Sequence, residues 1–169
     1  TYTDSYQYYP AVAGLADGSH VVTWTSSNQD GSSYGIYAQR YDITGRAMGE
    51  EFRVNTYTSS DQSNSDVTAL SDGGYVVTWQ DNSGYDGGYS WDIRGQHYDS
   101  DNNMVGDEFR VNTYTSHDQY DPSVEALDGG GFVVVWESNQ QDESGYGIYA
   151  QVYGADGETV GTESLVNVH

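Results

Sequence analysis

The chain of 169 residues contains no cysteine, no lysine and only two prolines. Without cysteine, neither a disulfide framework nor a thiolate metal site can form, so packing, hydrogen bonds, ions or subunit contacts must stabilise the fold. The sequence has no apolar run approaching the roughly 20 residues that a membrane-spanning helix needs, and no signal peptide is recognisable. We therefore expect no insertion into a membrane.

Positive charge is also scarce, since five arginines face 26 acidic side chains and the formal net charge is −21. A protein this negative repels polyanions, which excludes nucleic acid as a partner. The acidity has two interpretations: it keeps the protein soluble in a salty medium, or aspartate-rich loops hold calcium. Calcium is therefore the one cofactor that the sequence leaves open.

The sequence is rich in tyrosine, glycine and tryptophan, with 17, 21 and four residues. This composition favours short strands joined by tight turns. Aromatic residues are enriched in strands, and glycine supplies the conformations that tight turns require. The length suits one domain with a real core. These features predict an all-β fold.

The chain contains a sequence repeat that occurs three times. Three near-identical runs end in tryptophan: VVTW at 21–24, VVTW at 76–79 and VVVW at 133–136. The tryptophans are 55 and 57 residues apart. A second motif recurs as GIYAQRY at 35–41, DIRGQHY at 92–98 and GIYAQVY at 147–153, and EFRVNTYT begins at both Glu51 and Glu108. We predict one domain of three units, 1–55, 56–112 and 113–169.

Each unit contains four segments rich in Val, Tyr or Ile, which predict four short antiparallel strands. In the first unit these segments are 11–15, 20–25, 35–41 and 51–55. Asp17-Gly18 and its counterparts predict tight hairpin turns, in which aspartate has a structural role. The loops 26–34 and 56–65 are longer and polar. In an up-and-down meander both loops emerge on the same side, so we expect function there.

Candidate binding residues recur in these long loops. Aromatic residues precede the third strand of each unit, and aspartates lie four residues before two of them; the inter-unit loops add Asp-Gln pairs. These candidates are Tyr34, Trp91, Tyr146, Asp30, Asp142, Asp61, Gln62, Asp118 and Gln119. A flat aromatic ring stacks on the apolar side of a sugar, and carboxylate and amide groups pair with its hydroxyls. Sugar binding and simple anchoring of the loops are both open.

The repeated strand-end tryptophans have the same two interpretations. Trp24, Trp79 and Trp136 end apolar strands, where a large aromatic side chain usually packs in the core. A platform for sugars is the alternative.

The repeats resemble tandem units of large secreted bacterial adhesins of the RTX, or hemolysin-type calcium-binding, kind, on the motifs DGG(F/Y)VVxW, GIYAQxY and EFRVNTYT. Strands opening with Pro10-Ala11-Val12 or Pro122-Ser123-Val124 are also similar to blades of sialidase-like β-propellers, although Ser65 replaces proline in the second unit. The resemblance implies four-stranded blades, secretion and an extracellular adhesive setting. It transfers no catalytic residue, because the arginine cluster and tyrosine nucleophile of sialidase-type hydrolases do not match the arginines of this chain.

Three blades are too few for an ordinary closed propeller, so the free edges of the outer blades need a cover. Two chains forming a six-bladed ring would provide it, which makes a homodimer the first expectation. A β-trefoil, which also has three units of four strands, is the alternative architecture.

We predict a multivalent lectin or adhesin module that binds glycans or glycoproteins on cell surfaces, with N-acetylhexosamines or galactosides as first candidates, and not an enzyme. The four histidines do not recur at equivalent positions, and no Ser-His-Asp or metal-ligand spacing appears. Residues 99–103 have the oxygen spacing of a calcium loop but lack its glycine and terminal glutamate. A structural, non-binding repeat of a calcium-dependent adhesin and a glycosidase are the alternatives.

Overall fold

The computed structural model describes residues 2–84 and 90–167, which form three separate four-stranded antiparallel sheets. The strands of each sheet follow one another in chain order, as in a meander. The all-β prediction with propeller-like blades is confirmed. The trefoil alternative is wrong, because the hydrogen bonds of each sheet stay within one repeat.

The three sheets are called blades 1 to 3. Blade 1 contains β1 (Gln7–Gly14), β2 (His20–Ser27), β3 (Tyr34–Tyr41) and β4 (Ala47–Arg53). Blade 2 contains β5 (Gln62–Ala69), β6 (Tyr75–Asp81), β7 (Asp92–Tyr98) and β8 (Met104–Arg110). Blade 3 contains β9 (Gln119–Ala126), β10 (Phe132–Asn139), β11 (Tyr146–Tyr153) and β12 (Thr159–Leu165).

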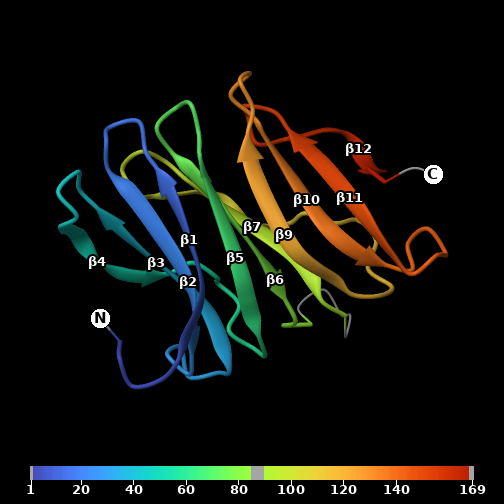
Figure 1. The fold of residues 1–169 in the computed structure, drawn as a ribbon, viewed down its shortest axis with the longest axis horizontal. Coiled ribbons are helices and arrows are strands. Elements are labelled where there is room, and N and C mark those ends of the chain that lie inside the picture. Colours follow the sequence, from blue (N-terminus) through green and yellow to red (C-terminus); the bar gives the residue numbers. More distant parts are fainter. Residues whose placement is uncertain (1, 85–89, 168–169) are drawn as a thin grey trace.

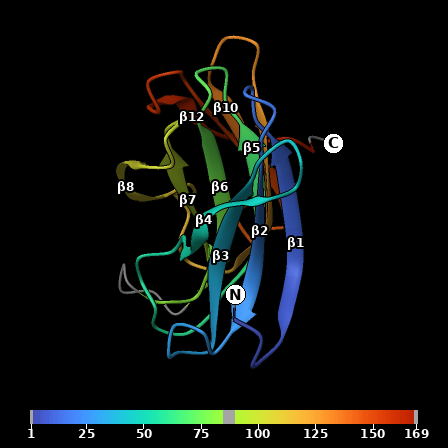
Figure 2. The same ribbon diagram turned by 90° about the vertical axis from the view of Figure 1, so that its left-hand side faces the viewer.

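The blades stand side by side with blade 2 in the middle (Figure 1). The first strands of the blades, β1, β5 and β9, are neighbours in space, and β4 and β8 lie on the opposite side (Figure 2). Sheets arranged in this way pack face to face, so each junction between blades is an interface between two sheet faces. The long loops at one end of the strands meet at these junctions.

The first strand of each blade is longer than the sequence predicts, because it contains a β-bulge. In β1 the register shifts between Tyr8 and Ala11, and Tyr9 has a φ of 49°. Asn64 and Asp121 hold the same conformation in blades 2 and 3, with φ of 55° and 51°. A bulge inserts an extra residue and breaks the alternation from which strands are recognised. The expected start at residue 11 therefore misses the part of β1 before the bulge.

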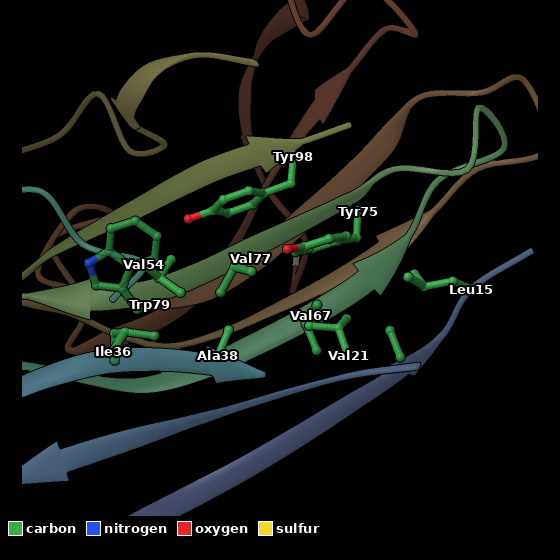
Figure 3. Packing of buried hydrophobic residues seen from close by; sticks show 11 residues of the cluster. Leu15, Val21, Ile36, Ala38, Val54, Val67, Tyr75, Val77, Trp79 and Tyr98 are labelled. Atoms are coloured by element: carbon green, nitrogen blue, oxygen red, sulfur yellow. The ribbon is translucent and has the colours of Figure 1, made fainter. Parts of the chain in front are cut away.

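Two hydrophobic clusters fill the junctions, one between each pair of neighbouring blades. At the first junction the rings of Tyr75 and Tyr98 stack with centroids 4.9 Å apart, and Trp79 packs near Ile36 and Val54 (Figure 3). The second junction repeats this packing with Phe132 stacked on Tyr153 and with Trp136. Burying large aromatic side chains is a major stabilising contribution to such a fold.

A buried asparagine joins each of the first two blades to the following loop. Asn55 Oδ1 accepts a hydrogen bond from the backbone N–H of Ile36 at 2.7 Å. Its Nδ2 donates to the carbonyl of Tyr57 and to Gln62 Oε1, at 2.8 and 3.1 Å. Asn112 makes the same set of contacts one repeat later. The recurring Val-Asn pair therefore fixes the path of the chain from one blade to the next.

Candidate functional site

The loop from β2 to β3 and the loop entering β5 meet at the junction of blades 1 and 2. Tyr34, the first residue of β3, forms an isolated parallel bridge with Asp61. Ser32 Oγ donates to the carbonyl of Ser60 at 3.3 Å, and the N–H of Asn82 donates to the Asp61 carbonyl at 2.8 Å. Loops from different repeats thus form one continuous surface on the side where the meander topology predicts them.

A cavity of about 320 Å³ opens at this junction. Its lining combines aromatic rings with short polar groups from both blades. The lining residues are Tyr8, Tyr9, Thr25, Tyr34, Asp61, Ser63, Gln80 and Trp91. The size and the mixture are those of a small-molecule site, in which apolar walls carry a few placed polar groups.

Tyrosines form the blade 1 wall of the cavity. The rings of Tyr8 and Tyr34 meet edge to face with centroids 6.2 Å apart, and Tyr6 and Tyr9 lie about the same distance from Tyr8. Tyr8 and Tyr9 remain exposed, so their rings are available to a ligand. Partial desolvation, followed by the neighbouring tyrosines, raises the pKa of Tyr8. Its hydroxyl therefore stays protonated at neutral pH and can donate a hydrogen bond.

The polar groups that line the cavity are held in place by hydrogen bonds. Gln80 Nε2 donates to Ser63 Oγ at 3.1 Å, and Gln80 Oε1 accepts from the N–H of Asp121 at 3.2 Å. Thr25 Oγ1 accepts from the N–H of Asn64 at 3.1 Å. Among the described residues Asp61 Oδ1 has no hydrogen-bond partner although water scarcely reaches it. A buried acceptor without a partner is unfavourable, so Asp61 gains from any donor that reaches it.

Three of the candidates named from the sequence line the cavity: Tyr34, Asp61 and Trp91. Sequence reasoning missed five lining residues, Tyr8, Tyr9, Thr25, Ser63 and Gln80. The unused signal is the density of tyrosines in TYTDSYQYY at the start of the chain. Because the bulge lengthens β1, Tyr8 and Tyr9 belong to the strand beside the cavity.

Other candidates named from the sequence are buried in the core or hydrogen-bonded within their own turns. Trp79 and Trp136 are buried in the two cores, so neither ring has a surface for a sugar, whereas Trp24 is half-buried on the outer face of blade 1. Gln62 and Gln119 are also fully buried. The remaining aspartates of the β2–β3 and β10–β11 loops accept hydrogen bonds within their own turns: Asp30 from Ser32 and Asp142 from Ser144.

The junction of blades 2 and 3 is related to this cavity but poorer in aromatic rings. Trp91 and Tyr120 have ring centroids 5.9 Å apart, and the backbone N–H of Trp91 donates to Asp118 Oδ1 at 3.0 Å. Burial, and then a hydrogen bond with the Asp118 carboxylate, raises the pKa of Tyr120 to about 12. Ser63 and Asn64 stand where blade 1 has Tyr8 and Tyr9. The repeats therefore present related sites that are not identical.

A buried charged cluster distinguishes blade 2. Arg94 lies 3.5 Å from Glu108 and 3.7 Å from Asp81, and its guanidinium is 5.4 Å from the centroid of the Tyr57 ring. Burial raises the pKa of both carboxyls. Glu108 also accepts hydrogen bonds from the backbone and hydroxyl of Thr56. These carboxylates are enclosed, so they act in the packing of blade 2.

In blades 1 and 3 a serine and a glutamine, which are uncharged, take the place of this cluster's arginine and aspartate and lead by hydrogen bonds to the glutamate. Ser26 donates to Gln29, which donates to Glu51, with both distances 2.7 Å. Ser138 and Gln141 repeat the chain to Glu163. The glutamate at this position is therefore held by a side chain of its own blade in all three repeats, but the partner is glutamine in blades 1 and 3 and arginine in blade 2.

Within the described part of the chain, acidic side chains and histidines are not clustered for metal binding, and the elements are strands. Across residues 2–84 and 90–167, no three His, Asp or Glu side chains are grouped so as to hold a metal ion. In residues 99–103, Asp99 Oδ1 accepts the N–H groups of Asp101 and Asn103, which closes the turn. No helix within the described ranges is long and apolar enough to cross a membrane.

Solved structures of β-propeller glycoside hydrolases share this fold. An α-L-arabinofuranosidase from Lactobacillus brevis superposes with a TM-score of 0.61 at 12% identity, over 94% of this chain and 53% of its own. An endo-arabinase from Bacteroides thetaiotaomicron has a TM-score of 0.61 at 17% identity, over 94% and 61%. A xylan β-1,4-xylosidase from Bacillus halodurans has a TM-score of 0.56 at 15% identity, over 95% and 32%.

At these identities the likeness concerns the fold alone, and the chain spans less than two thirds of each of these three proteins. No protein-family model matches the sequence. No curated protein matches it either.

Proposed function

We propose that this chain is a carbohydrate-binding module that holds a sugar ring in the cavity between blades 1 and 2. The observation that carries the proposal is the lining of that cavity, in which Tyr8, Tyr34 and Trp91 surround the polar side chains of Asp61 and Gln80. Aromatic faces stack on the C–H side of a pyranose, and the carboxylate and amide pair with its hydroxyls.

Binding without cleavage is the form of the proposal that the cavity favours. Glycoside hydrolysis ordinarily needs two carboxyl groups on opposite sides of the scissile bond. Among the described residues that line the cavity, Asp61 is the one carboxylate. The carboxylates of the buried charged cluster, Asp81 and Glu108, are enclosed beside Arg94. A single carboxylate serves well as a hydrogen-bond acceptor for sugar hydroxyls.

The proposed ligands are glycans or glycoproteins of cell surfaces. The likeness to tandem units of secreted adhesins supports an extracellular setting, and the likeness of the fold to glycoside hydrolases supports a carbohydrate ligand. N-acetylhexosamines and galactosides are the sugar classes proposed first, because an acetamido methyl group packs well on tyrosine and tryptophan. The related residues at the second junction provide a weaker second site, and linked weak sites gain avidity.

A glycan array tests this proposal. The wild-type protein is expected to bind one defined class of sugar, and Trp91→Ala is expected to weaken that binding about tenfold or more. Tyr114→Ala is the matched control, since Tyr114 hydrogen-bonds with His117 in a loop outside the cavity lining. An array without binding would contradict the proposal and favour a structural repeat.

Two further arms separate the alternatives. Repeating the array with a chelator measures whether calcium takes part, as in a calcium-assisted lectin. Incubation with chromogenic glycosides measures cleavage: release of the chromophore that is lost in Asp61→Asn would contradict binding alone and favour a glycosidase.

A further inference from the structure

The outer faces of blades 1 and 3 correspond to the two kinds of sheet face that pack together at the junctions within the chain. At each internal junction the back face of one blade packs on the front face of the next. Blade 1 also has a front face, and blade 3 also has a back face. No packing partner for these two faces occurs among residues 2–84 and 90–167.

The front face of blade 1 is defined here by Val12, His20, Val22, Trp24 and Tyr41. Its residues match, position by position, the front faces that are buried in blades 2 and 3. Val12 is 64% exposed, whereas its counterparts Val67 and Val124 are 5% and 3% exposed. The rings of His20 and Tyr41 stack at 5.3 Å, as the corresponding pairs do in both cores. This face therefore carries the residue types that form a buried interface in blades 2 and 3.

A hollow lies in the front face of blade 1. Its volume is about 270 Å³, and its walls include Pro10, Val22 and Trp24. At the first internal junction the side chains of Ile36 and Val54 lie near the equivalent tryptophan, Trp79 (Figure 3). Branched aliphatic side chains from another blade would fill this hollow in the same way.

The back face of blade 3 is defined here by Val133, Ile148 and Val166. The equivalent residues of blade 1, Val21, Ile36 and Val54, are completely buried against blade 2. In blade 3, Ile148 is 37% exposed and Val166 is 54% exposed. Exposed branched aliphatic side chains at these positions supply the groups that the front face of blade 1 accommodates.

The polar contacts across the internal junctions also have counterparts on the two outer faces. Thr25 accepts the N–H of the bulge residue Asn64 at the first junction, and Gln80 accepts that of Asp121 at the second. The next members of the two series are Glu137 on blade 3 and Tyr9 on blade 1. A glutamate carboxylate can accept the N–H of Tyr9 as Thr25 and Gln80 accept theirs.

We infer that the back face of blade 3 binds the front face of blade 1 of a second copy of this chain, and that two copies close a ring of six blades. The contact is heterologous, and a two-fold axis through the ring repeats it twice, so the assembly is finite. The inference depends on the repeated interface and is independent of any sugar ligand. It also differs from the expectation drawn from sequence, because sheet faces, and not strand edges, make the contact.

Exposed tyrosines at the loop end acquire partners in this ring. Tyr146, the counterpart of Tyr34, is 56% exposed, and Tyr6, the counterpart of Asp61, is 71% exposed. Tyr34 and Asp61 are bridged across the first junction. The ring places Tyr146 of one copy beside Tyr6 of the other in the same relation.

Analytical ultracentrifugation over about a hundredfold range of protein concentration tests the inference. The expected mass at the upper end is twice the chain mass of 18.6 kDa. Because each chain carries a net charge of −21, raising the salt concentration is expected to strengthen association. A single-chain mass throughout would overturn the inference, and so would masses above two chains.

Single substitutions identify the faces. Val12→Glu and Val166→Glu place a charge at exposed positions that tolerate it in the single chain, and each is expected to raise the dissociation constant about 100-fold or more. Circular dichroism checks that both variants fold. Ile43→Glu, at an exposed turn residue outside both faces, is the control and is expected to leave association unchanged.

Mixing the two variants distinguishes a heterologous contact from one in which the same face meets itself. Val166→Glu retains an intact front face, and Val12→Glu retains an intact back face, so an equimolar mixture is expected to regain pairs with one intact contact. If Val12→Glu alone abolished association while Val166→Glu paired normally, the contact would join two front faces and the inference would be wrong.

Discussion

Trp24 and Trp79 occupy the same position in the first two repeats, yet Trp79 is fully buried between blades 1 and 2 whereas Trp24 is half-buried on an outer face. Both residues end the same tetrapeptide, VVTW. The neighbouring blade, and not the local sequence, therefore decides which of the two is a core residue.

Replacing these tryptophans separates the two environments. We expect Trp79→Ala to lower the free energy of unfolding by about 3–5 kcal/mol, because it removes a large buried side chain and leaves a cavity. Trp24→Ala is expected to cost less than half as much at low protein concentration. Urea unfolding followed by circular dichroism measures both values, and equal losses would contradict the assignment of Trp79 to the core.

A buried and an exposed asparagine at equivalent positions are expected to differ in their contribution to the free energy of unfolding. In Asn112→Ala the N–H of Ile93 and the carbonyl of Tyr114 lose their partner inside the protein, and we expect a loss of about 2–4 kcal/mol in the free energy of unfolding. Asn167 makes the equivalent bond to Ile148 at an exposed site, so Asn167→Ala is the control with a loss below about 1 kcal/mol. Similar losses in both variants would argue against the role of burial.

Arg94 is expected to stabilise blade 2 through its two acidic neighbours. Arg94→Gln leaves Asp81 and Glu108 enclosed without their cation, which we expect to cost about 3–5 kcal/mol at neutral pH.

The same substitution has a pH signature. Without the cation both carboxyls favour protonation in the fold, so the destabilisation is expected to diminish as the pH falls towards their unfolded pKa values near 4. Thermal unfolding across this range measures the effect, and the exposed Arg46→Gln is the control. A loss that does not change with pH would contradict the proposed origin.

Much of the fold could be predicted from the sequence, because the repeat makes each strand visible three times. The VVTW and GIYAQRY motifs lie in the second and third strands, whereas the fourth strand, β4, begins at Ala47 and includes only the EFR of EFRVN, so the expected range 51–55 is four residues late at its start. The meander then places the loops that contain Tyr34 and Asp61 at one end, where the structure brings them together. Trp91 follows because it holds the place of Tyr34 in the next repeat.

The rest of the site is formed by residues that differ between the repeats, so comparing the repeats does not reveal them. Tyr8 and Tyr9 have Ser63 and Asn64 as counterparts, so averaging over repeats hides them. The bulge at Tyr9 also interrupts the alternation that would place both residues in a strand. Gln62 recurs like a binding residue, but its burial arises from the contact with Asn55, which joins residues seven apart across a turn.

The four tryptophans make the sugar-binding proposal testable in one titration, because each indole N–H gives its own signal in a proton–nitrogen correlation spectrum. Trp91 lines the cavity, Trp79 and Trp136 are buried in the cores, and Trp24 lies on the outer face of blade 1. Adding the sugar class selected by the array is expected to shift the Trp91 signal saturably and to leave those of Trp79 and Trp136 in place. A saturable shift confined to Trp24, or no shift at any indole, would contradict binding in the cavity between blades 1 and 2.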